Sequence, residues 1–353
     1  MITLIVPTLN RPDFIARILD YYEKVGYRHS IFIGDSSSGI HLERNKDTVA
    51  KSKNKVKVTY REYPNTNPTA CFKSLLESVV TPYAAFLPDD DFFIPNGLEK
   101  CIEFLEHNPE YAGAHGIGII LNLESPGPYG KVKNASGYQQ AVSREKTAAE
   151  RVLAYSGNPT LPLFSIYRTA VWKRAFCNVT ALADPAFTEL LPSYLAIISG
   201  KIARLDCLYS VRQCHDRRYL LRDVYDWITG QEWFPSYQVF YRCVIEALME
   251  TDGIKIEEAQ KIAKQAFWSY LSKIIPYKFH HQYIEDKKIG RKIKALVQGI
   301  PGGHSCLSVF RKIRPAAGGN LSLPALLKKS SPHHRDFMPI YDLITDHAGK
   351  NAV

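Results

Sequence analysis

The sequence lacks the marks of a secreted, a membrane-spanning or a zinc-binding protein. Its seven cysteines are odd in number and include no Cys-x-x-Cys pair, which argues against a disulfide framework and against a zinc ribbon. No apolar run approaches the roughly 18–20 residues of a transmembrane helix. The apolar start of the chain is short for a signal peptide and has no basic lead-in. These absences predict a cytoplasmic protein.

Repeats and low-complexity segments are also missing, which argues against a solenoid. The chain is 45% hydrophobic and 23% charged, so it is able to bury a core and is not a disordered chain. Its 353 residues are enough for roughly two domains of ~150 residues each.

Positive charge is concentrated toward the C-terminus. The net charge is +10, and residues 255–335 carry sixteen Lys or Arg against four acids, which leaves the rest of the chain slightly acidic. Such a segment either meets an anionic surface or forms a solvated helical face. Within it, Lys287–Lys294 (KKIGRKIK) suits peripheral attachment to anionic lipid, and packing inside the molecule is an equal alternative.

Short apolar runs alternate with amphipathic segments over the first hundred residues. Strands are expected at 3–6, 31–33, 56–60 and 83–87, with helices at 14–22, 70–80 and 96–105. This rhythm predicts a parallel sheet with crossover helices, whose ligands bind beyond the carboxyl ends of the strands. Polar clusters follow three of the four predicted strands, at residues 8–11, 35–37 and 89–91.

The second half of the chain has a different texture. It contains expected strands at 116–123, 162–167 and 202–211, a loop at 124–137, and helices at 143–156, 169–176 and 183–200. After residue 219 the pattern is helical, over 224–251, 256–275 and 283–297. We therefore expect a domain at 1–218, made of halves 1–111 and 112–218, followed by a helical, basic region at 219–353.

The acidic triplet Asp89-Asp90-Asp91 follows an apolar strand directly. Three adjacent carboxylates repel one another, so a folded protein tolerates them best where a cation compensates. Hard oxygen ligands suit Mg²⁺ or Mn²⁺, with substrate phosphates completing the shell. The alternative is a capped turn with surface acids.

Three motifs occur together in the order and spacing of a known family. They are VPTLNRP at the start, a strand ending in GDSS, and FLPDDDFFIP near residue 90. Together they resemble the glycosyltransferase A fold, specifically its family 2 type, over roughly residues 1–215. The resemblance implies a Rossmann-like α/β fold with a mostly parallel central sheet, a nucleotide-sugar donor and a divalent metal ion.

The resemblance also implies a nucleotide site. The turn Pro7–Arg11 is similar to the family's first loop along the base and ribose, and Arg11 either reaches a phosphate or is a surface charge. Asp35 resembles the acid that accepts the pyrimidine N3–H, which favours uracil over cytosine. Lys73 either lies against the nucleotide or is an ordinary helix lysine. The implied nucleotide-binding residues are Pro7, Thr8, Asn10, Arg11, Asp35, Lys73 and Asp89.

Within the triplet, relatives often read Leu-Asp-x-Asp, whereas Pro88 stands here in the place of the first acid. By the alignment that fits better, Asp89 resembles the acid that contacts the ribose and Asp90 the metal ligand for Mn²⁺ or Mg²⁺. Asp91 is either a second ligand or orients its neighbours. His215 either completes the metal shell, touches the diphosphate, or is a structural histidine.

Inverting glycosyl transfer needs a carboxylate that takes the proton of the acceptor hydroxyl. In family 2 this acid commonly opens a helix about eleven residues before a glycine, and Glu189 stands eleven positions before Gly200. Glu189 is therefore the candidate catalytic base, and Asp184 is the runner-up. The alternative for Glu189 is a first-turn acid favoured by the helix dipole.

Three arginines near the end of the resemblance, Arg212, Arg217 and Arg218, are candidates for a basic lid over the phosphates. The same segment lacks the QxxRW pattern of processive synthases, which favours a single-addition transferase. The expected acceptor is a glycan or a lipid-linked molecule in bacterial surface polysaccharide assembly, with the enzyme cytoplasmic or peripheral at the inner face of the membrane.

Two other functions compete with a metal-dependent UDP-sugar transferase. A nucleotidyltransferase of similar shape usually opens with a glycine-rich loop, and VPTLNRP has no glycine. A non-catalytic binder of anionic polymer would use the basic C-terminal region. No nucleic-acid partner is expected, because no RRM, KH or helix-turn-helix pattern accompanies that charge.

Overall fold

The computed structural model describes residues 1–124, 127–215, 223–279 and 320–346. These residues form one nine-stranded sheet in the order β3-β2-β1-β4-β8-β6-β9-β5, with β7 paired to β6. The strands are β1 (Ile2–Thr8), β2 (Ser30–Asp35), β3 (Val58–Glu62), β4 (Tyr83–Phe86), β5 (Asp91–Phe93), β6 (Tyr111–Leu123), β7 (Val132–Tyr138), β8 (Ile166–Arg168) and β9 (Lys201–Cys214).

The N-terminal half of the sheet is parallel, as the alternating pattern predicts. Strands β3, β2, β1 and β4 run in one direction, so their carboxyl ends meet at one edge. Beyond β4 the sheet is mixed: β8 is antiparallel to β4 and β6, whereas β6 and β9 are parallel. The predicted α/β fold class is thereby confirmed.

Two strands were not predicted. The segment at 124–137 is expected as a loop, but residues 132–138 form β7 along the edge of β6. This strand has no alternating apolar pattern, because most of its residues are polar or small and backbone hydrogen bonds to β6 stabilise it. β5 is too short to be visible as a periodic run, and its pairing with β9 defines it.

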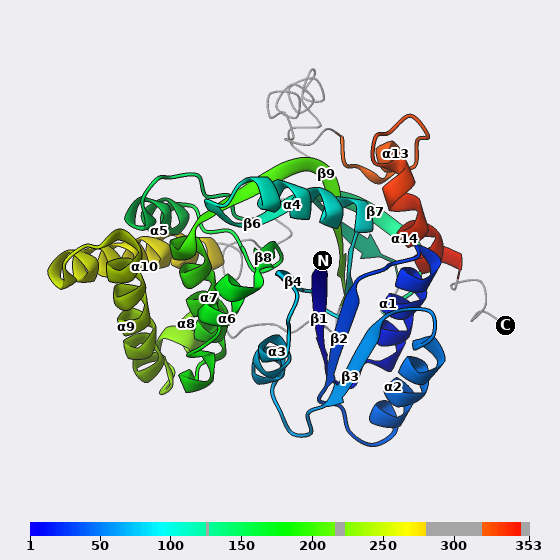
Figure 1. Ribbon diagram of the computed structural model, residues 1–353, viewed down its shortest axis with the longest axis horizontal. Helices are drawn as coiled ribbons and strands as arrows, with labels where there is room; N and C mark the ends of the chain where they lie inside the picture. The colour runs from blue at the N-terminus through cyan, green and yellow to red at the C-terminus, as the bar shows by residue number, and fades with distance from the viewer. Residues whose placement is uncertain (125–126, 216–222, 280–319, 347–353) are drawn as a thin grey trace, which may run out of the picture.

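Helices cover both faces of the sheet (Figure 1). One apolar core includes residues from α1 (Pro12–Lys24), α2 (Gly39–Ser52), α4 (Pro95–His107), α13 (Leu323–Leu326) and α14 (His334–Asp346). The other includes residues from α3 (Pro68–Glu77), α5 (Ala148–Gly157), α6 (Thr169–Ala175), the short 3-10 helix η1 (Val179–Ala181), α7 (Pro185–Ser199), α8 (Val224–Ile228), α9 (Trp233–Asp252) and α10 (Ile256–Phe279).

Strand β1 shows how the sequence divides between these two cores. Leu4 and Val6 belong to the core beneath α1, whereas Ile5 faces the core beneath α3. Successive side chains of a strand point to opposite faces, so an uninterrupted apolar run is buried on both sides. All three side chains are fully buried.

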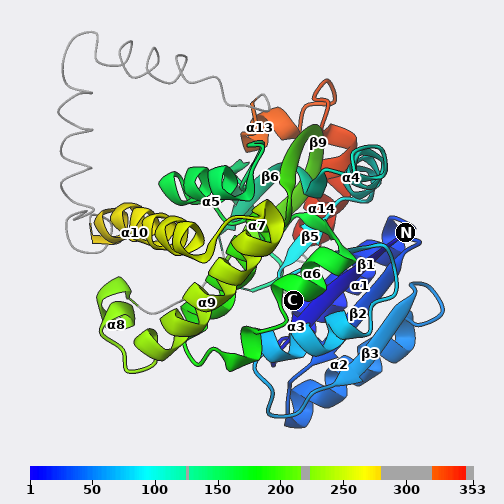
Figure 2. The same cartoon turned by 60° about the vertical axis from the view of Figure 1, so that its left-hand side comes forward.

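The C-terminal part of the chain packs on both faces of the sheet. Helices α9 and α10 pack against α7 and α5, and α14 packs against α1 and β7 (Figures 1 and 2). The predicted helix at 283–297 and the basic segment Lys287–Lys294 lie outside the described residues. The division into 1–218 and 219–353 stays a prediction.

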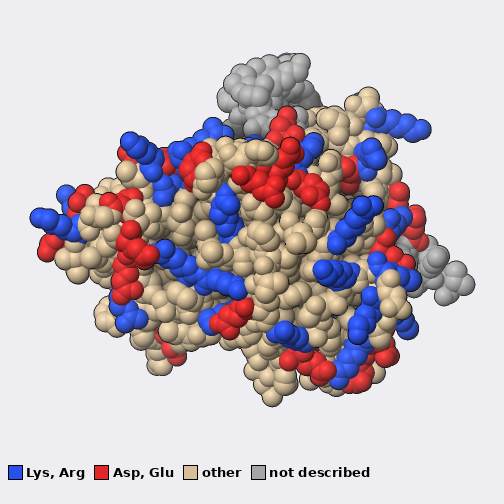
Figure 3. Space-filling model, in the orientation of Figure 1, with Lys and Arg blue, Asp and Glu red and all other residues tan. Residues whose placement is uncertain are grey.

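Over the part of the chain that the structure describes, no helix combines the length and apolarity needed to cross a bilayer. On the face in Figure 3, lysine and arginine side chains are interspersed with acidic ones. Acidic side chains gather over α4, whose exposed positions include Glu99, Glu103 and Glu106.

Candidate active site

The acidic triplet lies between β4 and β5, beyond the carboxyl ends of the parallel strands. Asp91 opens β5, which pairs antiparallel with β9 so that Asp91 stands opposite Arg212. This pairing brings the end of β9, with Arg212 and His215, to the same edge as Thr8 and Arg11. Residues from four parts of the chain therefore meet at the triplet.

Asp89 is held by the first loop. Its carboxylate accepts a hydrogen bond from the Thr8 hydroxyl at 2.7 Å and one from the Arg11 guanidinium at 2.8 Å. Burial raises the pKa of Asp89 to about 6, and the charge of Asp90 adds to this, while Arg11 and Thr8 oppose it. Asp89 thus retains a proton more readily than an exposed aspartate.

Asp90 has the opposite balance. Burial raises its pKa, but His215 and the charges of Arg11 and Arg17 outweigh that effect, so the pKa of Asp90 is lowered overall. The His215 Nε2 lies 2.8 Å from Asp90 Oδ2, and Arg11 lies 3.2 Å from the same oxygen. Asp90 is therefore the carboxylate of the triplet that stays ionised most readily.

Asp91 pairs with Arg212. The Arg212 Nε donates to Asp91 Oδ2 at 2.7 Å, and the Gln213 backbone amide donates to the other oxygen at 3.1 Å. Burial raises the pKa of Asp91 to about 6 despite the charge of Arg212. The guanidinium also lies over the rings of Phe164 and Tyr138, with centroid distances of 4.0 and 4.7 Å. Arg212 is thus fixed in one orientation.

Arg17 is a residue that the sequence reasoning missed. It is fully buried on α1, donates to the Asp90 backbone oxygen at 2.6 Å and to the Pro128 oxygen at 2.7 Å, and contacts Gln213. Burial lowers its pKa to about 10, so it remains a cation at neutral pH. The available signal was an arginine three residues after Phe14, within the apolar face of a helix.

Asp35 and Asn10 join the ends of β1 and β2. Asp35 is fully buried and accepts hydrogen bonds from Ser37 N at 2.8 Å, Asn45 at 2.8 Å and Tyr60 at 2.6 Å. Asn10 has a φ of 55°, a conformation that asparagine tolerates well, and its backbone N–H donates to Ser37 Oγ at 2.7 Å. The contact of Asp35 with a pyrimidine base stays a prediction.

Glu189 lies in the first half of α7, whose N-cap is Asp184. Asp184 Oδ1 accepts from the backbone amides of Ala186 and Phe187, at 2.9 and 3.2 Å, and from Trp227 Nε1 at 2.9 Å. Asp184 is thus occupied in holding the helix start. Burial raises the pKa of Glu189, and the charge of Arg212 opposes it. Arg212 thus acts electrostatically on Glu189 while it also binds Asp91.

The N-terminal part of the chain, which carries the acidic triplet, is similar to a known protein family. Residues 3–147 match the model of the glycosyl transferase family 2. They form a family 2 glycosyltransferase domain. Comparison with curated proteins gave no significant match.

The solved structures similar to the chain include S. aureus TarS. One TarS structure matches with a TM-score of 0.50 and 18% identity, covering 85% of this chain and 49% of TarS. The chain thus spans about half the length of that protein. TarS 1–349 in complex with UDP-GlcNAc matches with a TM-score of 0.51 and 16% identity, covering 99% of this chain and 90% of that one. At this identity the likeness concerns the fold.

Most of the predicted nucleotide-binding residues lie at the ends of β1 and β2, and one lies on α3. Pro7, Thr8, Asn10 and Arg11 lie in or after β1, and Asp35 ends β2. Lys73 lies on α3, where it pairs with Glu77 one turn along, so its contact with a nucleotide stays a prediction. The predicted lid residues Arg217 and Arg218 lie outside the described residues.

The donor set at the triplet fits a divalent cation in part. Asp90 Oδ2 and His215 Nε2, 2.8 Å apart, approach the ~3 Å spacing of neighbouring ligands around Mg²⁺ with bonds of about 2.0–2.1 Å. Both oxygens of Asp89 and of Asp91 accept hydrogen bonds from other protein groups. Among the described residues, no three His, Cys, Asp or Glu side chains form a closed metal cage. The two donors suit a cation whose other ligands are phosphate oxygens and water.

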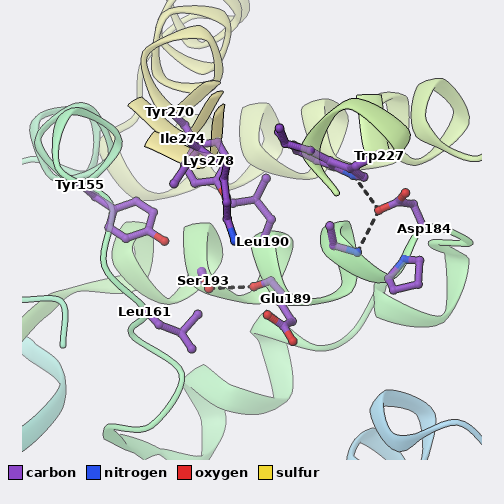
Figure 4. Close-up of a pocket in the computed structure, with 13 residues that line it drawn as sticks. Tyr155, Leu161, Asp184, Glu189, Leu190, Ser193, Trp227, Tyr270, Ile274 and Lys278 are labelled. Carbon is purple, nitrogen blue, oxygen red and sulfur yellow. Dashed lines mark hydrogen bonds between the residues drawn. The ribbon is translucent and has the colours of Figure 1, made fainter. Parts of the chain in front are cut away.

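A pocket adjoins Glu189 on the side of the C-terminal helices. Its volume is about 400 Å³, and α5, α7, α8 and α10 contribute its walls. Figure 4 shows Tyr270, Ile274 and Lys278 extending into it from α10, opposite Glu189 and Ser193 of α7. The candidate base therefore lines this pocket.

Proposed function

We propose that the protein is an inverting glycosyltransferase that moves a sugar from a UDP-sugar to the hydroxyl of a glycan or lipid-linked acceptor. The observation that carries this proposal is the partly buried carboxylate of Glu189, on which the charge of Arg212 acts while Arg212 binds Asp91 of the acidic triplet. The triplet itself lies within the residues that match the family 2 model. The UDP-GlcNAc complex of the structurally similar TarS supports UDP as the nucleotide.

In this proposal the nucleoside lies along the first loop. Thr8 and Asp89 meet at the end of β1, where the ribose is expected, and Asp35 lies one strand away, where the uracil N3–H is expected. Arg11 forms ion pairs with both Asp89 and Asp90. We expect it to turn toward the diphosphate when the donor binds, since a phosphate accepts its planar donors equally well.

Glu189 acts as the general base. It takes the proton of the acceptor hydroxyl as that oxygen attacks the anomeric carbon, and the bond from that carbon to the UDP oxygen breaks with its electron pair going to UDP. The attack comes from the face opposite UDP, so the configuration inverts. Burial that raises the pKa of Glu189 makes it a better base near neutral pH than an exposed glutamate.

Asp90 and His215 would hold Mn²⁺ or Mg²⁺ beside the diphosphate. The bound ion would neutralise negative charge on the departing UDP. Asp91 orients Arg212, whose fixed guanidinium adds positive charge on the same side. Arg217 and Arg218 complete the proposed lid.

The setting of the reaction is also a proposal. A glycan or lipid-linked acceptor fits bacterial surface polysaccharide assembly. The basic excess at 255–335 would attract the enzyme to an anionic membrane surface from the cytoplasmic side. This part of the proposal is independent of the chemistry at Glu189.

Calorimetric titration tests the donor class. UDP, CDP and GDP are titrated in Mn²⁺ and in chelator against wild type, Asp90→Ala and the control Asp47→Ala, an exposed acid of α2. We expect UDP to bind in Mn²⁺ only, to bind Asp47→Ala normally, and to bind Asp90→Ala at least tenfold more weakly. Equal binding of all three nucleotides, or of none, would contradict the proposal.

A further inference from the structure

The pocket beside Glu189 lies outside the groups assigned to the donor. Its walls are mainly apolar, formed by Leu161, Leu190, Val224, Trp227 and Ile274. Its volume of about 400 Å³ is at the small end of the ~300–1,000 Å³ typical of ligand sites. A molecule of one or two rings would fill it and reach the carboxylate of the candidate base.

Lys278 supplies the only cationic side chain among the described residues that line this pocket. Figure 4 shows its side chain extending from α10 into the pocket, toward Ser193 of α7. A lysine in the last turn of a helix is favoured by the helix dipole, but the dipole alone does not direct the side chain into a cavity.

Neither acidic side chain of the pocket forms an ion pair with Lys278. Asp184 is engaged by two backbone amides and Trp227, and the charge that acts on Glu189 is that of Arg212. Over the described part of the chain, no ion pair involves Lys278. Lys278 is exposed to solvent, and its side chain lines the pocket without an ion pair to the residues that the structure describes.

Two phenol groups complete the polar side of the pocket. Tyr155 is buried, and Figure 4 shows its hydroxyl pointing into the pocket. Burial raises the pKa of Tyr270 to about 12, and the charge of Glu189 adds to this, so its hydroxyl remains a donor. Hydroxyl donors and one ammonium group, against an apolar wall, suit a sugar-like ring that carries an anionic oxygen group.

We propose that this pocket binds the acceptor, and that the acceptor carries a phosphate or carboxylate group that pairs with Lys278. The inference rests on the proposed function, because it takes Glu189 as the base that receives the acceptor proton. The reacting hydroxyl would lie at Glu189, the apolar face of the ring against Leu190 and Ile274, and the anionic group at Lys278.

Three probes separate charge from ring shape: methyl β-glucoside, its 6-phosphate and methyl β-glucuronide. Each is titrated by calorimetry, with saturating UDP, into wild type and three variants, namely Lys278→Gln, Lys278→Arg and the control Lys273→Gln on an exposed position of the same helix. We expect at least one anionic probe to bind wild type about tenfold more tightly than the neutral one. Lys278→Gln should abolish that preference, and Lys278→Arg and Lys273→Gln should keep it.

Binding of the neutral probe as tight as that of both anionic ones would overturn the inference. An unchanged preference in Lys278→Gln, or no binding of any probe at millimolar concentration, would also overturn it. A preference for phosphate alone or for carboxylate alone would identify the group. If UDP binds and the anionic preference is absent, only this inference fails; if the preference is present and UDP does not bind, only the proposed donor fails.

Discussion

Removal of Arg212 should destabilise the protein in a way that depends on pH. Arg212 pairs with Asp91 at 2.7 Å, and the Asp91 side chain is only 3% exposed. In Arg212→Met the apolar stem still contacts Phe164 and Tyr138, but Asp91 loses its cation. Removing one partner of a buried ion pair costs about 3–5 kcal/mol, and we expect the lower end because the Arg212 side chain is 27% exposed.

The sign of the pH effect follows from the pKa of Asp91. With Arg212 present, this pKa is already raised to about 6, and without Arg212 it rises further. A folded-state pKa above the unfolded one means that folding stability falls as pH increases between the two values. Above pH 6 the wild type levels off, whereas the variant continues to lose about 1.4 kcal/mol per pH unit until the pH passes its higher pKa. The difference should thus be largest near pH 8 and small near pH 5.

Urea unfolding at pH 5 and pH 8 measures this difference for wild type, Arg212→Met, Asp91→Asn and the double variant. The double variant should recover most of the loss, because the uncompensated carboxylate is gone. The matched control is the exposed pair Arg44–Asp13, whose side chains are 50% and 54% exposed, and its cycle should give less than about 1 kcal/mol. An equal loss at both pH values, with no recovery in the double variant, would refute the reasoning.

Three further predictions concern the same edge of the sheet. Asp89→Asn should raise the free energy of unfolding at pH 8 by about 1–3 kcal/mol, because the raised pKa of Asp89 makes its ionised form unfavourable in the folded protein. This gain should vanish below pH 4, and a gain that persists at pH 4 would contradict this explanation. Arg17→Met should lower the free energy of unfolding by about 3 kcal/mol or more and weaken UDP binding, because the backbone oxygens of Asp90 and Pro128 lose their buried donor. Urea unfolding and calorimetry measure the two effects, and unchanged values would show that Arg17 does not hold the triplet in place. The apparent pKa of the acidic limb in the pH–rate profile for donor cleavage should lie above the ordinary glutamate value of 4.5. It should rise further in Arg212→Met, because Arg212 lowers the pKa of Glu189, and an unchanged value would show that Arg212 does not act on the catalytic base.

The sequence was most informative where one strand is buried on both faces. The run Thr3–Val6 and the polar cluster after it correctly predict β1 and the edge at which Thr8 and Arg11 lie. Apolar runs followed by polar residues have few alternatives in a parallel sheet, because the connections bring all carboxyl ends to one side. The parallel half of the fold was predictable for this reason.

The partners of the triplet were not predictable in the same way. The pairing of Asp91 with Arg212 depends on β5, a three-residue strand without a periodic pattern. Arg17 donates hydrogen bonds to Pro128 and Gln213, which are far from it in sequence. Long-range pairs of this kind depend on register and on loop paths, and neither is encoded in local periodicity.

The pocket depends on helices that the family resemblance does not reach. Periodicity predicts helical segments at 224–251 and 256–275, and the structure has α8, α9 and α10 there. It does not say that Ile274 and Lys278 would face Glu189, because amphipathic helices with aromatic residues pack in several ways. The packing of α10 against α5 determines which side chains of α10 line the pocket.

Cleavage of UDP-GlcNAc with water as the acceptor tests the central claim most directly, because it needs no knowledge of the natural acceptor. UDP release is measured in Mn²⁺ for wild type, Glu189→Gln and Asp184→Asn, with UDP affinity measured in parallel. We expect slow release by wild type, a loss of about 10²–10⁴-fold in Glu189→Gln with UDP affinity unchanged, and a much smaller loss in Asp184→Asn. Release by Glu189→Gln at the wild-type rate, or a complete loss only in Asp184→Asn, would contradict it.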